Sequence, residues 1–80
     1  MKVEILYFSQ IKDKVGKSSE VLEFTGNTVS DLVEFLAQKY PNAKDVLEKS
    51  MFAVNEEYVE KQKILKEGDK IAIIPPVSGG

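Results

Sequence analysis

Residues 28–41 read TVSDLVEFLAQKYP, and this stretch decides the fold of the chain. Its apolar side chains recur every three or four positions, which is typical of one face of an α-helix. Thr28 is a favourable N-cap residue, and Asp31 completes a variant of the capping box. Tyr40-Pro41 predicts the helix end, because the residue before a proline avoids the helical conformation. The apolar stripe comprises Val29, Leu32, Val33, Leu36, Ala37 and Tyr40.

Strand-like segments lie on both sides of this helix. Residues 2–8 and 18–24 precede it, joined by a connection with about one helical turn that Gly16 closes. A short helix over 43–49, a strand over 51–54, a return strand at 58–59 and a last strand over 70–74 follow it. Gly68 supplies the positive φ of the turn before the last strand. The order predicts an α+β fold, with one main helix on one face of a mixed sheet and the first and last strands at its centre.

The composition excludes several kinds of protein. The chain has 80 residues, which is one domain, and it contains no Cys, no His and no Trp. We therefore expect no disulfide, no metal site and no tightly bound cofactor. The 13 acidic and 11 basic residues are mixed along the chain, so nothing indicates nucleic-acid binding. No signal peptide and no apolar run of about 20 residues is present, which predicts a cytoplasmic protein that does not enter a membrane.

The first strand predicts that one face of the sheet is only partly covered. Val3, Ile5 and Tyr7 share one face, whereas Glu4, Leu6 and Phe8 share the other, where a charge lies beside large apolar groups. If the first and last strands are parallel, Phe8 and Ile74 lie at the same end of the sheet, with Leu6, Ala72 and Tyr58 close by. We interpret Phe8, Tyr58 and Ile74 as a partner-binding patch, since exposed apolar patches usually mark contacts. The alternative is that Phe8 and Ile74 are core residues under a loop.

The last six residues, PPVSGG, predict a tail that follows a domain of residues 1–74. Pro75 and Pro76 favour an extended chain, whereas Gly79 and Gly80 lack a Cβ and fit a narrow channel. Val77 and Ser78 lie between the two pairs. Adenylation by ATP would turn the carboxylate of Gly80 into a mixed anhydride with AMP, and a sulfur nucleophile could then replace AMP and form a thiocarboxylate. A chain without Cys could carry sulfur in this way, although flexible Gly-rich termini are common and usually have no function.

The PPVSGG tail, the Glu67-Gly68-Asp69 turn and the order of elements resemble the MoaD family over residues 1–80. These proteins are the small sulfur-carrying subunits of molybdopterin synthase, with a β-grasp, ubiquitin-like fold. The resemblance implies that an E1-like, MoeB-like enzyme adenylates Gly80, which becomes a thiocarboxylate. It also implies that the tail enters a large, MoaE-like subunit in a heterotetramer and donates sulfur to precursor Z. The chain would then be no enzyme by itself, and ATP would be used by the activating partner.

Three alternatives remain open at this point. ThiS, the sulfur carrier of thiazole synthesis, also ends in Gly-Gly on a β-grasp body, but it usually lacks the proline pair seen at Pro75-Pro76. A ubiquitin-like modifier would instead join Gly80 to lysines of other proteins. A plain interaction domain would not need Gly79 and Gly80 at all.

Overall fold

The computed structural model describes residues 1–76, so the predictions for Val77, Ser78, Gly79 and Gly80 lie outside the described residues. The elements are β1 (Lys2–Tyr7), α1 (Ser9–Val15), β2 (Ser19–Glu23), α2 (Val29–Lys39), the 3-10 helix η1 (Pro41–Ala43), α3 (Lys44–Lys49), β3 (Met51–Val54), β4 (Glu57–Val59) and β5 (Lys70–Ile74). Every predicted strand is present. One connection differs, because residues 9–15 form a helix of seven residues where about one turn was expected. Ile11 is fully buried and Gly16 ends the helix at φ 88°, which together stabilise the longer helix.

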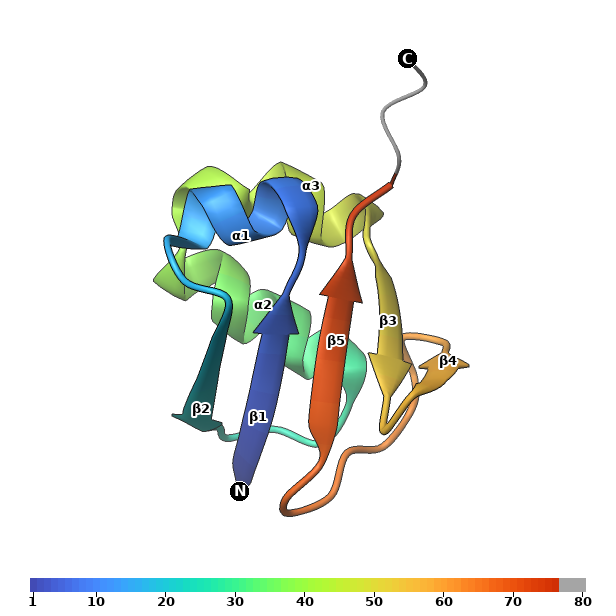
Figure 1. Ribbon diagram of the computed structural model, residues 1–80. Helices are drawn as coiled ribbons and strands as arrows, with labels where there is room; N and C mark the ends of the chain where they lie inside the picture. Colours follow the sequence, from blue (N-terminus) through green and yellow to red (C-terminus); the bar gives the residue numbers. More distant parts are fainter. Residues whose placement is uncertain (77–80) are drawn as a thin grey trace.

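The five strands form one mixed sheet in the order β2-β1-β5-β3-β4. Figure 1 shows β1 and β5 side by side and pointing the same way, with their carboxyl ends at the same edge. The remaining neighbours are antiparallel. The prediction that the first and last strands are adjacent at the sheet centre is therefore confirmed. As a result, the chain passes from β5 into Pro75 beside the turn that joins β1 to α1.

The helix α2 has the predicted ends. The Asp31 backbone N–H donates to Thr28 Oγ1 at 3.2 Å, and the Thr28 N–H donates to Asp31 Oδ2 at 3.1 Å, so the capping box is complete. At the other end Tyr40 is the C-cap and Pro41 begins η1. The backbone N–H groups of Asn27 and Thr28 both donate to Asp31 Oδ2, and they lower the pKa of Asp31 because they stabilise its charged form.

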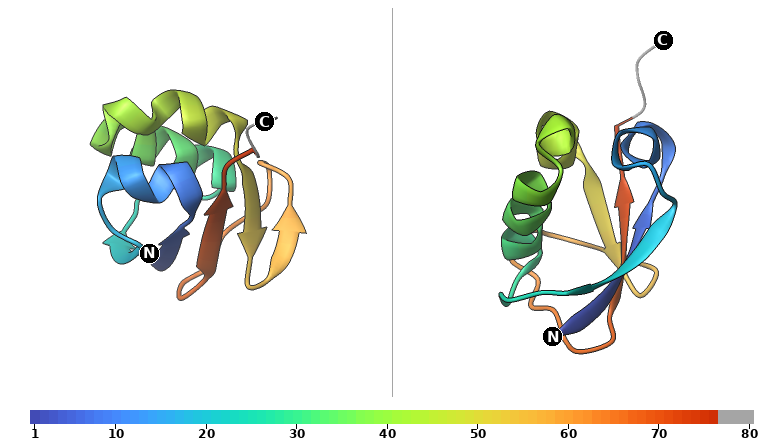
Figure 2. Two further views of the ribbon diagram at one scale, coloured as in Figure 1. Left: turned by 45° about the horizontal axis from the view of Figure 1, so that its top comes forward. Right: turned by 90° about the vertical axis from the view of Figure 1, so that its left-hand side faces the viewer.

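The helices leave one sheet face open. Figure 2 shows α2 and α3 against one side of the sheet, while α1 lies at the edge where β1 and β5 end. The inward side chains of the strands pack under these helices. The largest fully buried side chains are Tyr7, Phe24, Ile5, Ile11, Leu32, Leu36, Leu47, Ile71, Ile73, Val3 and Val29. Within residues 1–76 no helix has the length and apolar character needed to span a membrane.

Candidate functional site on the open sheet face

The base of the tail belongs to the packed body. Ile74, the last residue of β5, lies opposite Met51 in the antiparallel pair of β5 and β3. Pro75 is buried and Pro76 is exposed, so the two prolines have different surroundings. The Pro76 carbonyl accepts a hydrogen bond from Gln10 Nε2 at 3.5 Å. The carboxyl end of the described chain is thus held between β3 and α1.

An apolar patch covers the open sheet face next to this point. Its first row runs straight across four strands, because Leu6 faces Ala72, Ala72 faces Ala53 and Ala53 faces Tyr58. A second row lies two residues nearer the tail and contains Ile74 and Met51. Phe8 directly follows β1 at the same end of the sheet. We define the apolar patch as Leu6, Phe8, Met51, Ala53, Tyr58, Ala72 and Ile74.

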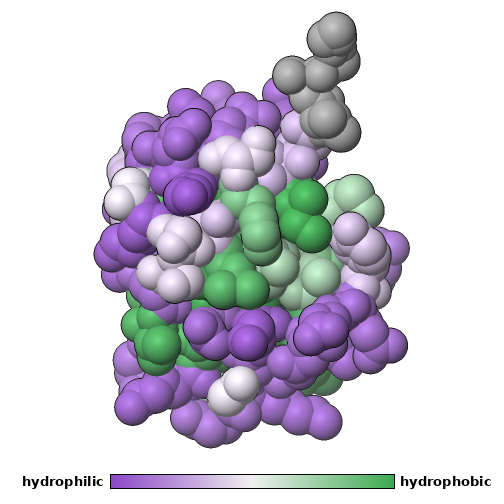
Figure 3. Space-filling model, viewed as in Figure 1, coloured by the Kyte–Doolittle hydropathy of each residue, from purple (hydrophilic) through white to green (hydrophobic). Residues whose placement is uncertain are grey.

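Several side chains of the patch are exposed to solvent. Phe8 is 45% exposed, Met51 56% and Tyr58 66%, whereas Leu6, Ala72 and Ile74 are half-buried. Figure 3 shows a hydrophobic area over the middle of this face, with hydrophilic residues above and below it. The alternative that Phe8 and Ile74 are core residues under a loop is therefore wrong. The structure brings Phe8, Tyr58 and Ile74 to one face, together with Met51 and Ala53, which the sequence analysis did not assign to it.

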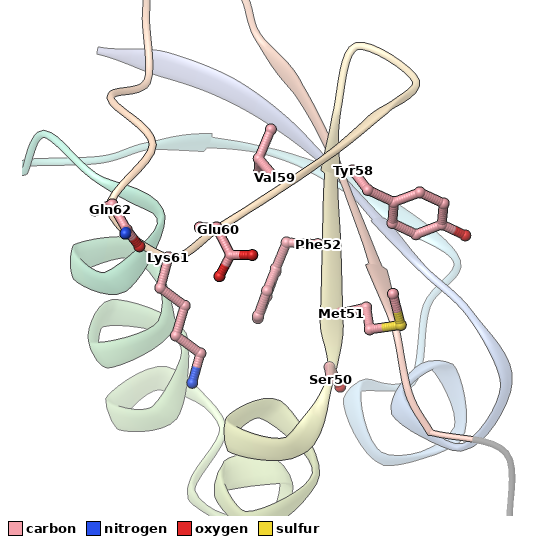
Figure 4. Close-up of a pocket in the computed structure, with 8 residues that line it drawn as sticks. All are labelled: Ser50, Met51, Phe52, Tyr58, Val59, Glu60, Lys61 and Gln62. Carbon is pink, nitrogen blue, oxygen red and sulfur yellow. The ribbon is translucent and has the colours of Figure 1, made fainter.

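The patch continues into an open groove at the β4 edge of the sheet. Figure 4 shows the side chains of Met51 and Tyr58 on one side of β3, with those of Phe52, Glu60 and Lys61 on the other. Lys61 Nζ also donates to the Glu48 carbonyl of α3 at 3.2 Å. The groove has a volume of about 530 Å³ and is lined by Ser50, Met51, Phe52, Tyr58, Val59, Glu60, Lys61 and Gln62.

A polar row bounds the patch on the side away from the tail. Glu4 of β1 and Lys70 of β5 lie opposite each other and form this row, and the exposed apolar Val21 of β2 lies opposite Glu4 at its end. Glu4 and Lys70 form an exposed ion pair at 4.0 Å. Asn55 continues the row, since its Oδ1 accepts from the Lys70 N–H at 3.0 Å. The apolar patch therefore occupies the tail end of the open face only.

A polar cluster on the covered side of the sheet was not predicted from the sequence. Glu20 Oε2 accepts hydrogen bonds from the hydroxyls of Tyr7 and Tyr40, each at 2.6 Å. Its Oε1 accepts from Lys17 at 3.3 Å and Lys39 at 3.4 Å. The cluster ties β1, β2 and the end of α2 together. The available signal was the alternation in β2, because Glu20 stands two residues before the buried Leu22 and so faces inward.

The pKa values of the cluster follow from these contacts. Burial by itself would raise the pKa of Glu20, but hydrogen bonds from Tyr40, Tyr7 and Lys17 and the charge of Lys39 outweigh it and lower the pKa. Burial and the carboxylate of Glu20 raise the pKa of Tyr40 to about 12 and that of Tyr7 further still. At neutral pH the cluster is therefore one carboxylate with two neutral phenols and two ammonium groups. It stabilises the covered side of the sheet, since it joins β1, β2 and the end of α2.

The sequence and the fold are similar to those of a known family of small proteins. The family described as ThiS matches residues 5–80. The molybdopterin synthase sulfur carrier subunit of Dictyostelium discoideum is 40% identical over 81 residues, covering 96% of this chain and 94% of the relative. The chain therefore belongs to the ThiS family, and its relatives include molybdopterin synthase sulfur carrier subunits, as the resemblance to MoaD predicted.

Two solved structures contain chains similar to this one. Subunit 1 in the complex of subunits 1 and 2 of molybdopterin-converting factor from Helicobacter pylori is 28% identical, with a TM-score of 0.71 and complete coverage of both chains. The small archaeal modifier protein 1 of Methanosarcina acetivorans is 26% identical, with a TM-score of 0.82, covering 99% of this chain and 96% of that one. The β-grasp fold is therefore confirmed. The relatives from Dictyostelium discoideum and Helicobacter pylori are both named as subunits.

Proposed function

We propose that this chain carries sulfur as a thiocarboxylate on Gly80 and that its partner transfers this sulfur to precursor Z in molybdopterin synthesis. One observation carries the proposal: the strand that leads into the Gly-Gly tail ends at Ile74, inside the exposed apolar patch. A partner that covers the patch would receive the tail at the same time. The likeness to sulfur carrier subunits over nearly the whole chain supports the same function.

The chemistry takes place at the chain terminus. A carboxylate oxygen of Gly80 attacks the α-phosphorus of ATP, and pyrophosphate leaves. A sulfur nucleophile at the oxidation level of hydrosulfide then bonds to the carbonyl carbon as AMP departs. The product is a thiocarboxylate whose sulfur can be given to an electrophilic carbon of the pterin precursor. No side chain of this protein needs to act as nucleophile, which agrees with a sequence without Cys or His.

The partners follow from this chemistry. An E1-like enzyme would bind the tail and ATP, and a large MoaE-like subunit would supply the pterin site and the catalytic side chains, in a heterotetramer. The complex formed by the H. pylori relative supports the second partner. We place both steps in the cytoplasm, where ATP is available to the activating enzyme. The apolar patch would bind each partner in turn.

The first experiment is an intact-mass measurement on the protein isolated from cells that contain its activating enzyme. We expect an increase of about 16 Da, the difference between one sulfur and one oxygen atom. The increase must disappear when Gly80 is deleted. An unmodified mass in the presence of active enzyme and a sulfur source would contradict the proposal.

The second candidate is a protein modifier, which the likeness to a small archaeal modifier protein favours. In that case the activated Gly80 forms an isopeptide bond with a lysine amine of a target, and AMP leaves. Trypsin cleaves after Lys70, the last basic residue of the chain, so mass spectrometry of digested cell extract would then find target lysines that carry the branch of residues 71–80. The same preparation thus separates the two functions.

A further inference from the structure

The packing at the base of the tail indicates which contacts set the direction in which the chain leaves the body. The ladder between β3 and β5 holds Ile74 opposite Met51, and Pro75 is buried behind it. The next residue, Pro76, is exposed, and its carbonyl accepts the hydrogen bond from Gln10. A side chain from another element therefore holds the last described peptide.

The turn between β1 and α1 brings Gln10 to this place. Ser9 has a φ of 53°, a left-handed conformation that is strained for a residue with a side chain. Such strain is often found where a backbone serves function. The turn leaves Phe8 exposed in the apolar patch and places Gln10 beside Pro76. A cleft of about 210 Å³ adjoins this contact, lined by Gln10, Asp45, Val46, Lys49 and Pro76.

We propose that Gln10 is a positioning residue that fixes the direction in which the chain leaves the body at Pro76. This inference rests on the proposed function, because it concerns the tail whose Gly80 is activated. Four residues follow Pro76, and four residues span at most about 14 Å. The activating enzyme must therefore bring its adenylation site within that distance of the Gln10–Pro76 contact.

Loss of the Gln10–Pro76 contact should weaken binding to the activating enzyme, and it should leave the rate of adenylation unchanged. Without the contact, only a fraction of the molecules presents the tail in the direction that the enzyme accepts. The apparent dissociation constant rises by the inverse of that fraction. Once the tail is seated, adenylation of Gly80 proceeds at its ordinary rate.

The experiment compares Gln10→Glu, which removes the donor at nearly constant size, with Gln10→Arg, which keeps a donor of sufficient reach. Gln38→Glu is the matched control, since Gln38 is also an exposed helical residue but lies on α2. Pyrophosphate exchange with the activating enzyme measures KM and kcat for each carrier. We expect KM to rise about threefold in Gln10→Glu, the effect of one exposed hydrogen bond, with kcat unchanged. Gln10→Arg and Gln38→Glu should stay near the wild type.

A second measurement on the carrier alone tests the contact itself. Loss of a hydrogen bond to the Pro76 carbonyl should move its ¹³C resonance upfield in Gln10→Glu but not in Gln38→Glu. An unchanged KM in Gln10→Glu would overturn the inference. A raised KM with an unchanged Pro76 resonance would also overturn it, because Gln10 would then act by touching the enzyme. If the wild type itself supports no exchange, the proposed function fails, which is a different result.

Discussion

The two faces of the central strands β1 and β5 differ sharply, although their residues alternate along the same chain. On the covered face Ile5, Ile71 and Ile73 are completely buried under the helices. On the open face Leu6 and Ile74 are only half-buried, although they are of similar size and polarity. Burial of an apolar side chain stabilises a fold in proportion to the area removed from water. The covered face therefore supplies stability, whereas the open face keeps apolar area available for a partner.

Ile73→Ala should have the largest effect, because Ile73 is fully buried on the central strand β5. Truncation of a buried isoleucine removes apolar contacts and leaves a cavity, which lowers the free energy of unfolding by about 2–5 kcal/mol. Urea denaturation measures this change. The control Ile73→Val should lose about 1 kcal/mol. A loss below 1 kcal/mol in Ile73→Ala would show that the covered face contributes less than its burial indicates.

Glu20→Gln tests the polar part of the covered face. Its side chain is 10% exposed and accepts four hydrogen bonds, two from phenols and two from lysines. The uncharged amide keeps one accepting oxygen, and its NH2 group cannot accept a hydrogen bond, so the free energy of unfolding should fall by about 1–3 kcal/mol at pH 7. Chemical denaturation checks the value. An unchanged stability would mean that the desolvation of Glu20 cancels its hydrogen bonds.

The same substitution should change how stability depends on pH. Because folding lowers the pKa of Glu20, its contribution is complete above the unfolded pKa of about 4.3 and is lost as the pH falls through the folded pKa. Because folding raises the pKa of Tyr40 to about 12, that contribution is complete below about pH 10 and is lost as the pH rises toward 12. In Glu20→Gln the melting temperature, measured by thermal unfolding, should therefore fall less than in the wild type, both at acid pH and as the pH rises toward 12.

Ile74→Ala is the counterpart on the open face, one residue from Ile73. The half-buried side chain lies beside the tail, so its loss should cost less than about 1 kcal/mol of stability. We expect the dissociation constant for the large subunit to rise about tenfold, as for a side chain at the centre of an interface. Calorimetric titration measures it. Ile64→Ala is the matched control, because Ile64 is 64% exposed but lies outside the apolar patch. Equal losses in both variants would rule out a specific patch.

Sequence periodicity predicted the parts of this fold that depend on neighbours along the chain. The stripe of α2, its Thr28 cap and the alternation in β1 all correspond to observed elements. The helix α1 was underestimated, since only Ile11 is buried in it and one apolar residue gives no period. The contacts of Glu20 with Tyr40 and of Gln10 with Pro76 could not be predicted from the sequence, because the partners are 20 and 66 residues apart. Such contacts depend on how the elements pack.

Val21→Thr should have the smallest effect. It tests how far the partner-binding surface extends across the open face. Val21 is 63% exposed on the edge strand β2, and it lies opposite Glu4 in the polar row. Threonine keeps the β-branched shape, so stability should change by less than about 0.5 kcal/mol. Binding of the large subunit should also stay within about twofold, because Val21 lies outside the apolar patch. The calorimetric titration used for Ile74→Ala decides this. A tenfold loss would mean that the partner crosses the Glu4–Lys70 pair and covers the whole open face.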